Sequence, residues 1–184
     1  MNDQEIDLLI PHLWGDGVDL VYAILDGARD ARVHPTVTQS GLTHQCLFSG
    51  ALGKELTAAA PYLVQLKRDA EATRTILRLG WGESWGIYLT SPAGIEHLRR
   101  HFRRFLRVQD EGGKRLFFRY YDPRVLRPYL PTCNEGELAT VFGPVTTFMA
   151  EAPTPGELLV YRRAGSILHL GVVPWAKQAP VEGA

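Results

Sequence analysis

Five arginines gather in one short stretch of the chain, and their spacing could support binding chemistry. They are Arg99, Arg100, Arg103, Arg104 and Arg107. Apolar residues recur among them at steps of three and four, which predicts one helix with an apolar stripe and arginines mostly on its other sides. A guanidinium forms paired hydrogen bonds with carboxylates and stacks on aromatic rings. The block therefore predicts either a surface for an acidic partner or a solvated helix face.

Histidine and cysteine spacing offers little metal or nucleophile chemistry. His97 and His101 would share a helix face, but Leu98 stands where the metalloprotease pattern needs a glutamate. Cys46 and Cys133 lie far apart and form no metal-ligand spacing. A thiol nucleophile would need an oriented base, which no local pattern supplies. We therefore expect no bound metal, no cofactor and two reduced thiols that pack as small apolar groups.

The sequence carries no phosphate-binding loop or nucleophile motif. The glycines of residues 80–86 (GWGESWG) superficially resemble a nucleotide loop, but they precede a predicted strand instead of joining a strand to a helix. No serine lies in a nucleophile elbow, and the carboxylates show no paired spacing. These patterns predict a protein that is not an enzyme.

Length and composition predict one soluble domain. The chain has 184 residues, of which 45% are hydrophobic and 22% charged, as expected for a single globular core. The formal net charge is zero, which makes a general nucleic-acid binder unlikely on charge alone. The start of the chain is acidic where a signal peptide is basic, and no apolar run approaches the roughly 18 residues of a membrane span. We therefore expect a cytoplasmic protein without membrane contact.

The order of the predicted elements indicates the fold class. Strands alternate with helices through the middle of the chain and then pair at the end, which predicts an α/β fold: a single compact domain with a mixed sheet flanked by helices. We expect a lead-in over residues 1–18, the domain over 19–173 and a flexible tail over 174–184. A helix is predicted from Ser91-Pro92 to Arg107, with Leu98, Phe102 and Phe105 packed on the sheet.

Residues 113–131 (GKRLFFRYYDPRVLRPYLP) join a predicted strand to a predicted helix. The bulky and aromatic run over 116–121 predicts a buried strand at the centre of the sheet. Asp122 stands where a helix N-cap belongs, and the proline after it suits the first helical position. Arg119 and Arg124 flank this join.

This stretch resembles the hallmark of the effector-adaptor (effector-chaperone) family of bacterial type VI secretion, first catalogued as a domain of unknown function. The likeness continues as an ordered series of blocks across residues 19–151. The blocks include 22–30 (YAILDGARD), 60–66 (APYLVQL), 80–89 (GWGESWGIYL), 98–106 (LRRHFRRFL), 119–126 (RYYDPRVL) and 142–145 (FGPV). An ordered series is far more specific than any single short block.

The resemblance implies a non-catalytic adaptor that binds a toxic effector in the cytoplasm and helps to load it onto the valine-glycine-repeat (VgrG) spike protein, which many members also contact. The candidate partner-binding residues are Arg99, Arg103, Arg104, Arg119, Tyr121, Asp122 and Arg124. Two other classes stay open. A nucleic-acid-binding module would use the Arg99–Arg107 helix against phosphates, and a small enzyme would assemble its site from distant residues.

Overall fold

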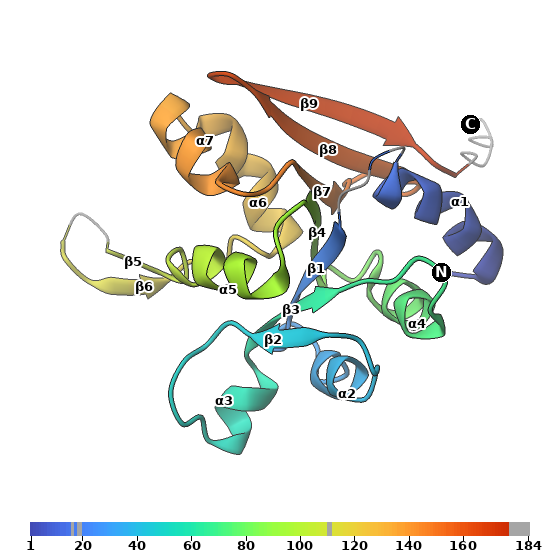
Figure 1. The fold of residues 1–184 in the computed structure, drawn as a ribbon, viewed down its shortest axis with the longest axis horizontal. Helices are drawn as coiled ribbons and strands as arrows, with labels where there is room; N and C mark the ends of the chain where they lie inside the picture. The colour runs from blue at the N-terminus through green and yellow to red at the C-terminus, as the bar shows by residue number, and fades with distance from the viewer. Residues whose placement is uncertain (16, 18–19, 110–111, 177–184) are drawn as a thin grey trace, which may run out of the picture.

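A seven-stranded sheet organises the chain, which a computed structural model describes over residues 1–15, 17, 20–109 and 112–176. Its strand order is β2-β3-β1-β4-β7-β8-β9 (Figure 1). The strands are β1 (Leu20–Asp26), β2 (His44–Cys46), β3 (Pro61–Gln65), β4 (Gly86–Ser91), β7 (Thr147–Glu151), β8 (Glu157–Ala164) and β9 (Ile167–Pro174), with β5 (Arg107–Gln109) and β6 (Arg115–Phe117) in a separate two-stranded sheet.

The α/β class of a helix-flanked sheet is confirmed, but the expectation of a mixed sheet is wrong. Every strand pair in the described part of the chain is antiparallel. The sequence suggested parallel neighbours because a helix connects β3 to β4. These two strands do run in the same direction, but β1 lies between them and pairs with both in the opposite direction.

Helices cover both faces of the sheet (Figure 1). They are α1 (Asp3–Trp14), α2 (Val33–Thr38), α3 (Lys54–Ala58), α4 (Glu71–Gly80), α5 (Ile95–Arg103), α6 (Pro123–Tyr129), the short 3-10 helix η1 (Leu130–Thr132) and α7 (Glu135–Phe142). One buried cluster joins the sheet to α1, α2 and α4, and a second joins its other face to α5, α6 and α7. Cover on both faces explains why β1 is apolar at nearly every position.

The segment expected as a lead-in contains α1, which belongs to the core. Ile6, Leu9 and Leu13 are buried at helical spacing in the first cluster. Asn2 begins the helix with a capping box: its side chain accepts the Glu5 N–H, and the Glu5 carboxylate accepts the Asn2 N–H. This helix was not predicted from the sequence.

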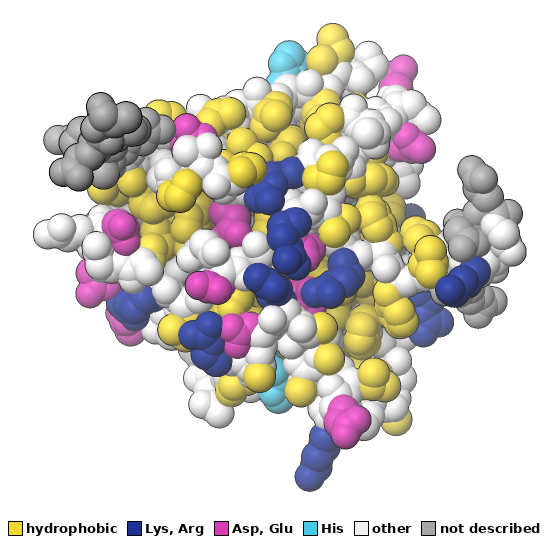
Figure 2. Space-filling model, turned by 180° about the vertical axis from the view of Figure 1, so that it is seen from behind, with side chains coloured by type: hydrophobic (Ala, Val, Ile, Leu, Met, Phe, Trp, Pro, Cys, Tyr) yellow, Lys and Arg dark blue, Asp and Glu magenta, His cyan; other side chains and the backbone are white. Residues whose placement is uncertain are grey.

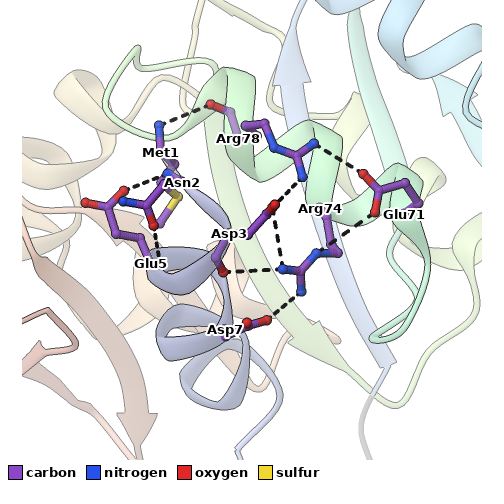
Figure 3. A network of polar contacts seen from close by, with 8 residues as sticks. All are labelled: Met1, Asn2, Asp3, Glu5, Asp7, Glu71, Arg74 and Arg78. Atoms are coloured by element: carbon purple, nitrogen blue, oxygen red, sulfur yellow. Dashed lines mark hydrogen bonds and ion pairs between the residues drawn. The ribbon is translucent and has the colours of Figure 1, made fainter.

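An ion-pair network links α1 to α4 (Figure 3). The Arg74 guanidinium lies 2.6 Å from the Asp7 carboxylate, and that of Arg78 lies 2.6 Å from the Asp3 carboxylate. Glu71 extends the network to both arginines. Exposed ion pairs of this kind each contribute roughly 0–1 kcal/mol, so buried apolar contacts provide most of the attachment of α1.

Residues 116–121 do not form a central strand, contrary to the prediction. β6 takes up only the start of this run, and the β5–β6 sheet projects from the body (Figure 1). Leu116 and Phe117 are exposed, whereas Tyr120 and Tyr121 are buried. The run is aromatic because its second half packs as an irregular segment against α5, and burial alone does not distinguish such a segment from a strand.

The helix expected from Ser91-Pro92 to Arg107 exists but is shorter at both ends: α5 ends at Arg103, and Arg107 begins β5. α5 has Gly94 as its N-cap, while Ser91 ends β4, and its hydroxyl accepts the Ala93 N–H and donates to the Pro144 carbonyl. Leu98 and Phe102 are buried and Phe105 is half-buried, so the predicted apolar stripe is confirmed.

The expected terminal hairpin is confirmed. β8 and β9 pair along their whole length and turn at Gly165, whose φ of 60° favours glycine. Of the predicted tail, residues 177–184 lie outside the described residues, whereas Pro174 ends β9 and Trp175 is buried. Among the described helices, none is long and apolar enough to cross a membrane.

Candidate functional site

Asp122 caps α6, as its place before a proline predicted. Its Oδ1 accepts the backbone N–H of Arg124 at 2.9 Å, and its Oδ2 accepts a bond from the Arg124 guanidinium at 2.6 Å. Burial acts to raise the pKa of Asp122, but the bonds and charge of Arg124 outweigh it and hold that pKa below its usual value. The Asp122–Arg124 pair therefore connects the capping residue to the first turn of α6, both within the motif.

Asp122→Ala is expected to lower the free energy of unfolding by about 0.5–2 kcal/mol, because it removes the cap. Since the folded-state pKa is lowered, this stability is present above the unfolded pKa of roughly 3.9 and is lost as the pH falls through the folded value. Urea denaturation at neutral and acidic pH measures the difference, and Asp122→Asn should retain much of it as a cap. Unchanged stability combined with lost partner binding would instead make Asp122 a contact residue.

Arg119 points to the end of β1. Its guanidinium pairs with the Asp26 carboxylate, which is only 1% exposed and also accepts the Ala28 N–H at 3.0 Å. Burial raises the pKa of Asp26, and the Arg119 charge offsets only part of that rise. Tyr121 is buried nearby, and burial likewise raises the pKa of its phenol. Asp26 was not predicted as a partner of Arg119, because an Asp-Gly pair after a strand is also an ordinary turn signal.

The glycine-rich segment 80–86 is held by a carboxylate. Glu151, at the end of β7, accepts the N–H of Gly82 at 2.6 Å, the N–H of Ser84 at 3.1 Å and the Ser84 hydroxyl at 3.0 Å. Arg127 of α6 donates to the Glu151 carbonyl at 2.9 Å. A cavity of about 550 Å³ lies beside these groups.

Figure 2 views the molecule from the side opposite to that of Figure 1. Near the middle of this face, Lys and Arg side chains lie with Asp and Glu side chains beside them.

A second hollow lies beside α5, and we call it the arginine groove. It has a volume of about 440 Å³. It is lined by Leu47, Phe48, Ser49, Leu52, Leu56, Arg100, Arg103, Arg104, Leu106, Arg107 and Phe117. These residues come from the segment before and within α3, from α5 and its C-terminal end, and from β5–β6.

The arginine groove combines an apolar floor with an unneutralised basic rim. Phe117 is 61% exposed and lies against Phe48, with 5.6 Å between ring centroids, while Leu56 is exposed nearby. The Arg107 guanidinium lies over the Phe117 ring at 5.9 Å. Within the described residues, no carboxylate pairs with any of the four groove arginines. In this respect the groove arginines differ from Arg119 and Arg124 of the motif, each of which has an acidic partner.

The predicted site residues therefore divide into separate places. Arg103 and Arg104 line the groove, whereas Arg99 donates its Nε–H to the Cys46 carbonyl at 2.9 Å. Arg119, Tyr121, Asp122 and Arg124 belong to the motif. The apolar floor was not predicted, because the leucines before α3 lack clear periodicity and Phe117 was expected to be buried.

The histidines of α5 have different surroundings. His101 is buried, and its Nε2 lies 2.9 Å from the Val141 carbonyl, with the Arg104 guanidinium 3.3 Å from its Nδ1. Burial lowers the pKa of His101. His97 is exposed. In the described parts of the chain, no three His, Cys, Asp or Glu side chains gather as metal ligands.

A family model matches residues 21–140, which is more than half of the chain. It is described as "Domain of unknown function (DUF4123)". No curated protein and no solved structure matches the chain. The matched span contains Asp26, the whole arginine groove and α6, whereas Glu151, β8 and β9 lie beyond it.

Proposed function

The chain belongs to the DUF4123 family, and we propose that it is a non-catalytic adaptor that binds a type VI secretion effector in the cytoplasm and helps to load it onto the VgrG spike. The ordered motif blocks that resemble the effector adaptors support this proposal, and most of them fall within the matched span. The observation that carries it is the arginine groove. Exposed apolar side chains beneath unpaired arginines have the chemistry of a protein-docking surface.

The occupant of the groove is an acidic, amphipathic segment of the effector. Its apolar side chains would lie on Phe48, Leu56 and Phe117, and its carboxylates would bond to Arg103 and Arg104. Guanidinium groups bind carboxylates in a bidentate way, and arginine and aromatic residues are enriched where binding energy concentrates. A hollow of about 440 Å³ suits a few side chains of a segment.

Nucleic acid is the competing occupant, since unpaired arginines also bind phosphates. The apolar floor and the formal net charge of zero favour a protein segment instead. The two occupants differ in their response to salt, because binding that releases counterions from nucleic acid weakens steeply as salt rises.

Arg103→Glu or Arg104→Glu is expected to weaken effector capture by at least about tenfold while leaving the fold intact, since like charges would then meet across the groove. The measurement is co-expression and pull-down with a candidate type VI effector, followed by titration of the purified pair. Arg68→Glu is the matched control, because Arg68 is exposed and lies outside the groove. Thermal melting of each variant checks the fold.

Each result bears on a separate part of the proposal. If the complex forms and both groove variants bind like the wild type, the groove is not the docking surface. If the wild type recovers no effector and instead retains nucleic acid in a salt-sensitive way, the adaptor function itself is wrong.

A further inference from the structure

Within the described residues, β9 is a long sheet edge that is protected only at its end, by Pro174. It pairs only with β8, and Figure 1 shows no described element beyond it. Its eight residues, ILHLGVVP, include no lysine, arginine or carboxylate. Proteins usually protect such edges with charges, bulges or very short strands, and the opposite edge, β2, has only three residues. An open edge of this length and composition indicates a site for another strand.

The printed hydrogen bonds fix which backbone groups of β9 face outward. The Trp175 N–H donates to the Gly156 carbonyl of the β8 side at 2.9 Å. Because bonding direction alternates along an antiparallel strand, odd-numbered residues of β9 face β8. Leu168, Leu170 and Val172 therefore direct their N–H and C=O groups to the open edge. Pro174, which has no N–H to offer, also holds an outward position.

The same three residues form an aliphatic stripe along the edge. Directly paired residues share a face, so Leu170 lies beside Tyr161 and Val172 beside Leu159, on the side of the sheet covered by α5–α7. Leu170 is 50% exposed and Val172 is 53% exposed, whereas Leu168 is half-buried. The edge thus offers both unpaired backbone groups and apolar surface to an incoming strand.

We propose that β9 pairs with β9 of a second copy of this chain, antiparallel about a two-fold axis at Leu170. Apart from His169 and Gly171, the residues at mirror positions about Leu170 are both aliphatic. Leu168 would oppose Val172, and Ile167 would oppose Val173, so that aliphatic side chains meet aliphatic side chains. The two sheets would then form one continuous sheet across an isologous interface.

Backbone bonding selects this register over its neighbours. With the axis at Leu170, each outward-facing residue opposes another outward-facing residue, and every outward N–H meets a carbonyl. A shift by one residue would oppose outward-facing to inward-facing groups and lose the ladder. A shift by two residues in one direction would place Pro174 opposite Leu168, where it cannot donate. A shift by two in the other direction would place Val172 opposite Ser166 of the turn and Ile167 opposite Gly171, which loses two of the aliphatic pairs. On the other face, His169 would oppose Gly171, which leaves room for the imidazole ring.

Sedimentation equilibrium of the full chain tests the proposal. The wild type should dimerise at micromolar concentrations. Leu170→Lys should make it monomeric, because two ammonium groups would meet across the axis. Leu8→Lys is the matched control. Leu8 is 51% exposed on α1, so this substitution introduces the same charge at a similar exposure, and the variant should remain dimeric. A wild type that stays monomeric at several hundred micromolar, or a dimer that Leu170→Lys leaves intact, would overturn it.

A cross-linking experiment tests the register. A hydrogen-bonded antiparallel pair has Cα atoms about 5.5 Å apart, within disulfide reach. In a background with Cys46 and Cys133 replaced by serine, Leu170→Cys should give a covalent dimer on mild oxidation, and Leu8→Cys should not. A wild-type dimer that Leu170→Cys fails to cross-link would place the axis elsewhere and refute the proposed pairing.

Discussion

Replacing Phe102 with alanine is expected to lower the free energy of unfolding by about 3–5 kcal/mol. Phe102 is 1% exposed and lies where three parts of the fold meet. Its ring stacks on Tyr120 of the motif at 5.8 Å between centroids and meets Phe148 of β7 edge-on at 6.3 Å. Because α5, the motif and the sheet all border the ring, no single element can move to fill the cavity.

Urea denaturation of Phe102→Ala and Phe117→Ala measures this effect against a matched control. Each change removes one phenyl ring. Because the Phe117 side chain is 61% exposed, its removal should alter the free energy of unfolding by no more than about 0.5 kcal/mol. A loss below about 1 kcal/mol for Phe102→Ala would mean that the site closes up or that the ring is not buried.

The second large effect is expected for Arg119→Met, which should destabilise the fold by about 3 kcal/mol at neutral pH. This loss of stability is at the low end of the range expected when one partner of a buried ion pair is removed, because the Arg119 side chain is 39% exposed while that of Asp26 is 1% exposed. The change leaves the Asp26 carboxylate buried without its cation. Arg78→Met is the control, since its partner carboxylates on Asp3 and Glu71 are 67% and 70% exposed, so the change leaves no carboxylate buried and should alter stability little.

The pH dependence of Arg119→Met has a definite sign. Burial already raises the folded-state pKa of Asp26 above its unfolded value, and loss of Arg119 raises it further. The folded state then binds more protons than the unfolded state, so stability falls as the pH rises from about 3.9 through the folded pKa. The penalty relative to the wild type should therefore shrink toward pH 4. An equal penalty at pH 4 and pH 8 would show that lost packing, not the buried charge, causes it.

Local patterns predicted the elements that depend on local residues. The β8–β9 hairpin, the apolar stripe of α5 and the Asp122 cap each follow from periodicity or from one special residue, and all are confirmed. The direction of strand pairing could not be predicted in this way, because β1 enters between two strands that come later in the chain. The place of the run 116–121 was also missed, since aromatic residues mark burial but do not decide between a strand and a packed irregular segment.

Only the charged residues of the candidate site were predicted from the sequence. The spacing of Arg103 and Arg104 placed them off the apolar stripe, and both line the groove. Its floor could not be predicted, because Phe48, Leu56 and Phe117 come from segments far apart in sequence. The partners of the motif arginines differ in the same way. Asp122 is two residues from Arg124, whereas Asp26 reaches Arg119 only after the whole domain has folded.

The central place of β1 also determines what happens while the chain is being made. β1 leaves the ribosome early, but its neighbours are β3 (Pro61–Gln65) and β4 (Gly86–Ser91). At roughly 5–20 residues per second of translation, this apolar strand waits on the order of several seconds before both of its edges are paired. Unpaired edges of this kind associate readily with other chains. The yield of native protein should therefore depend on how well nascent β1 is shielded until β4 has been synthesised.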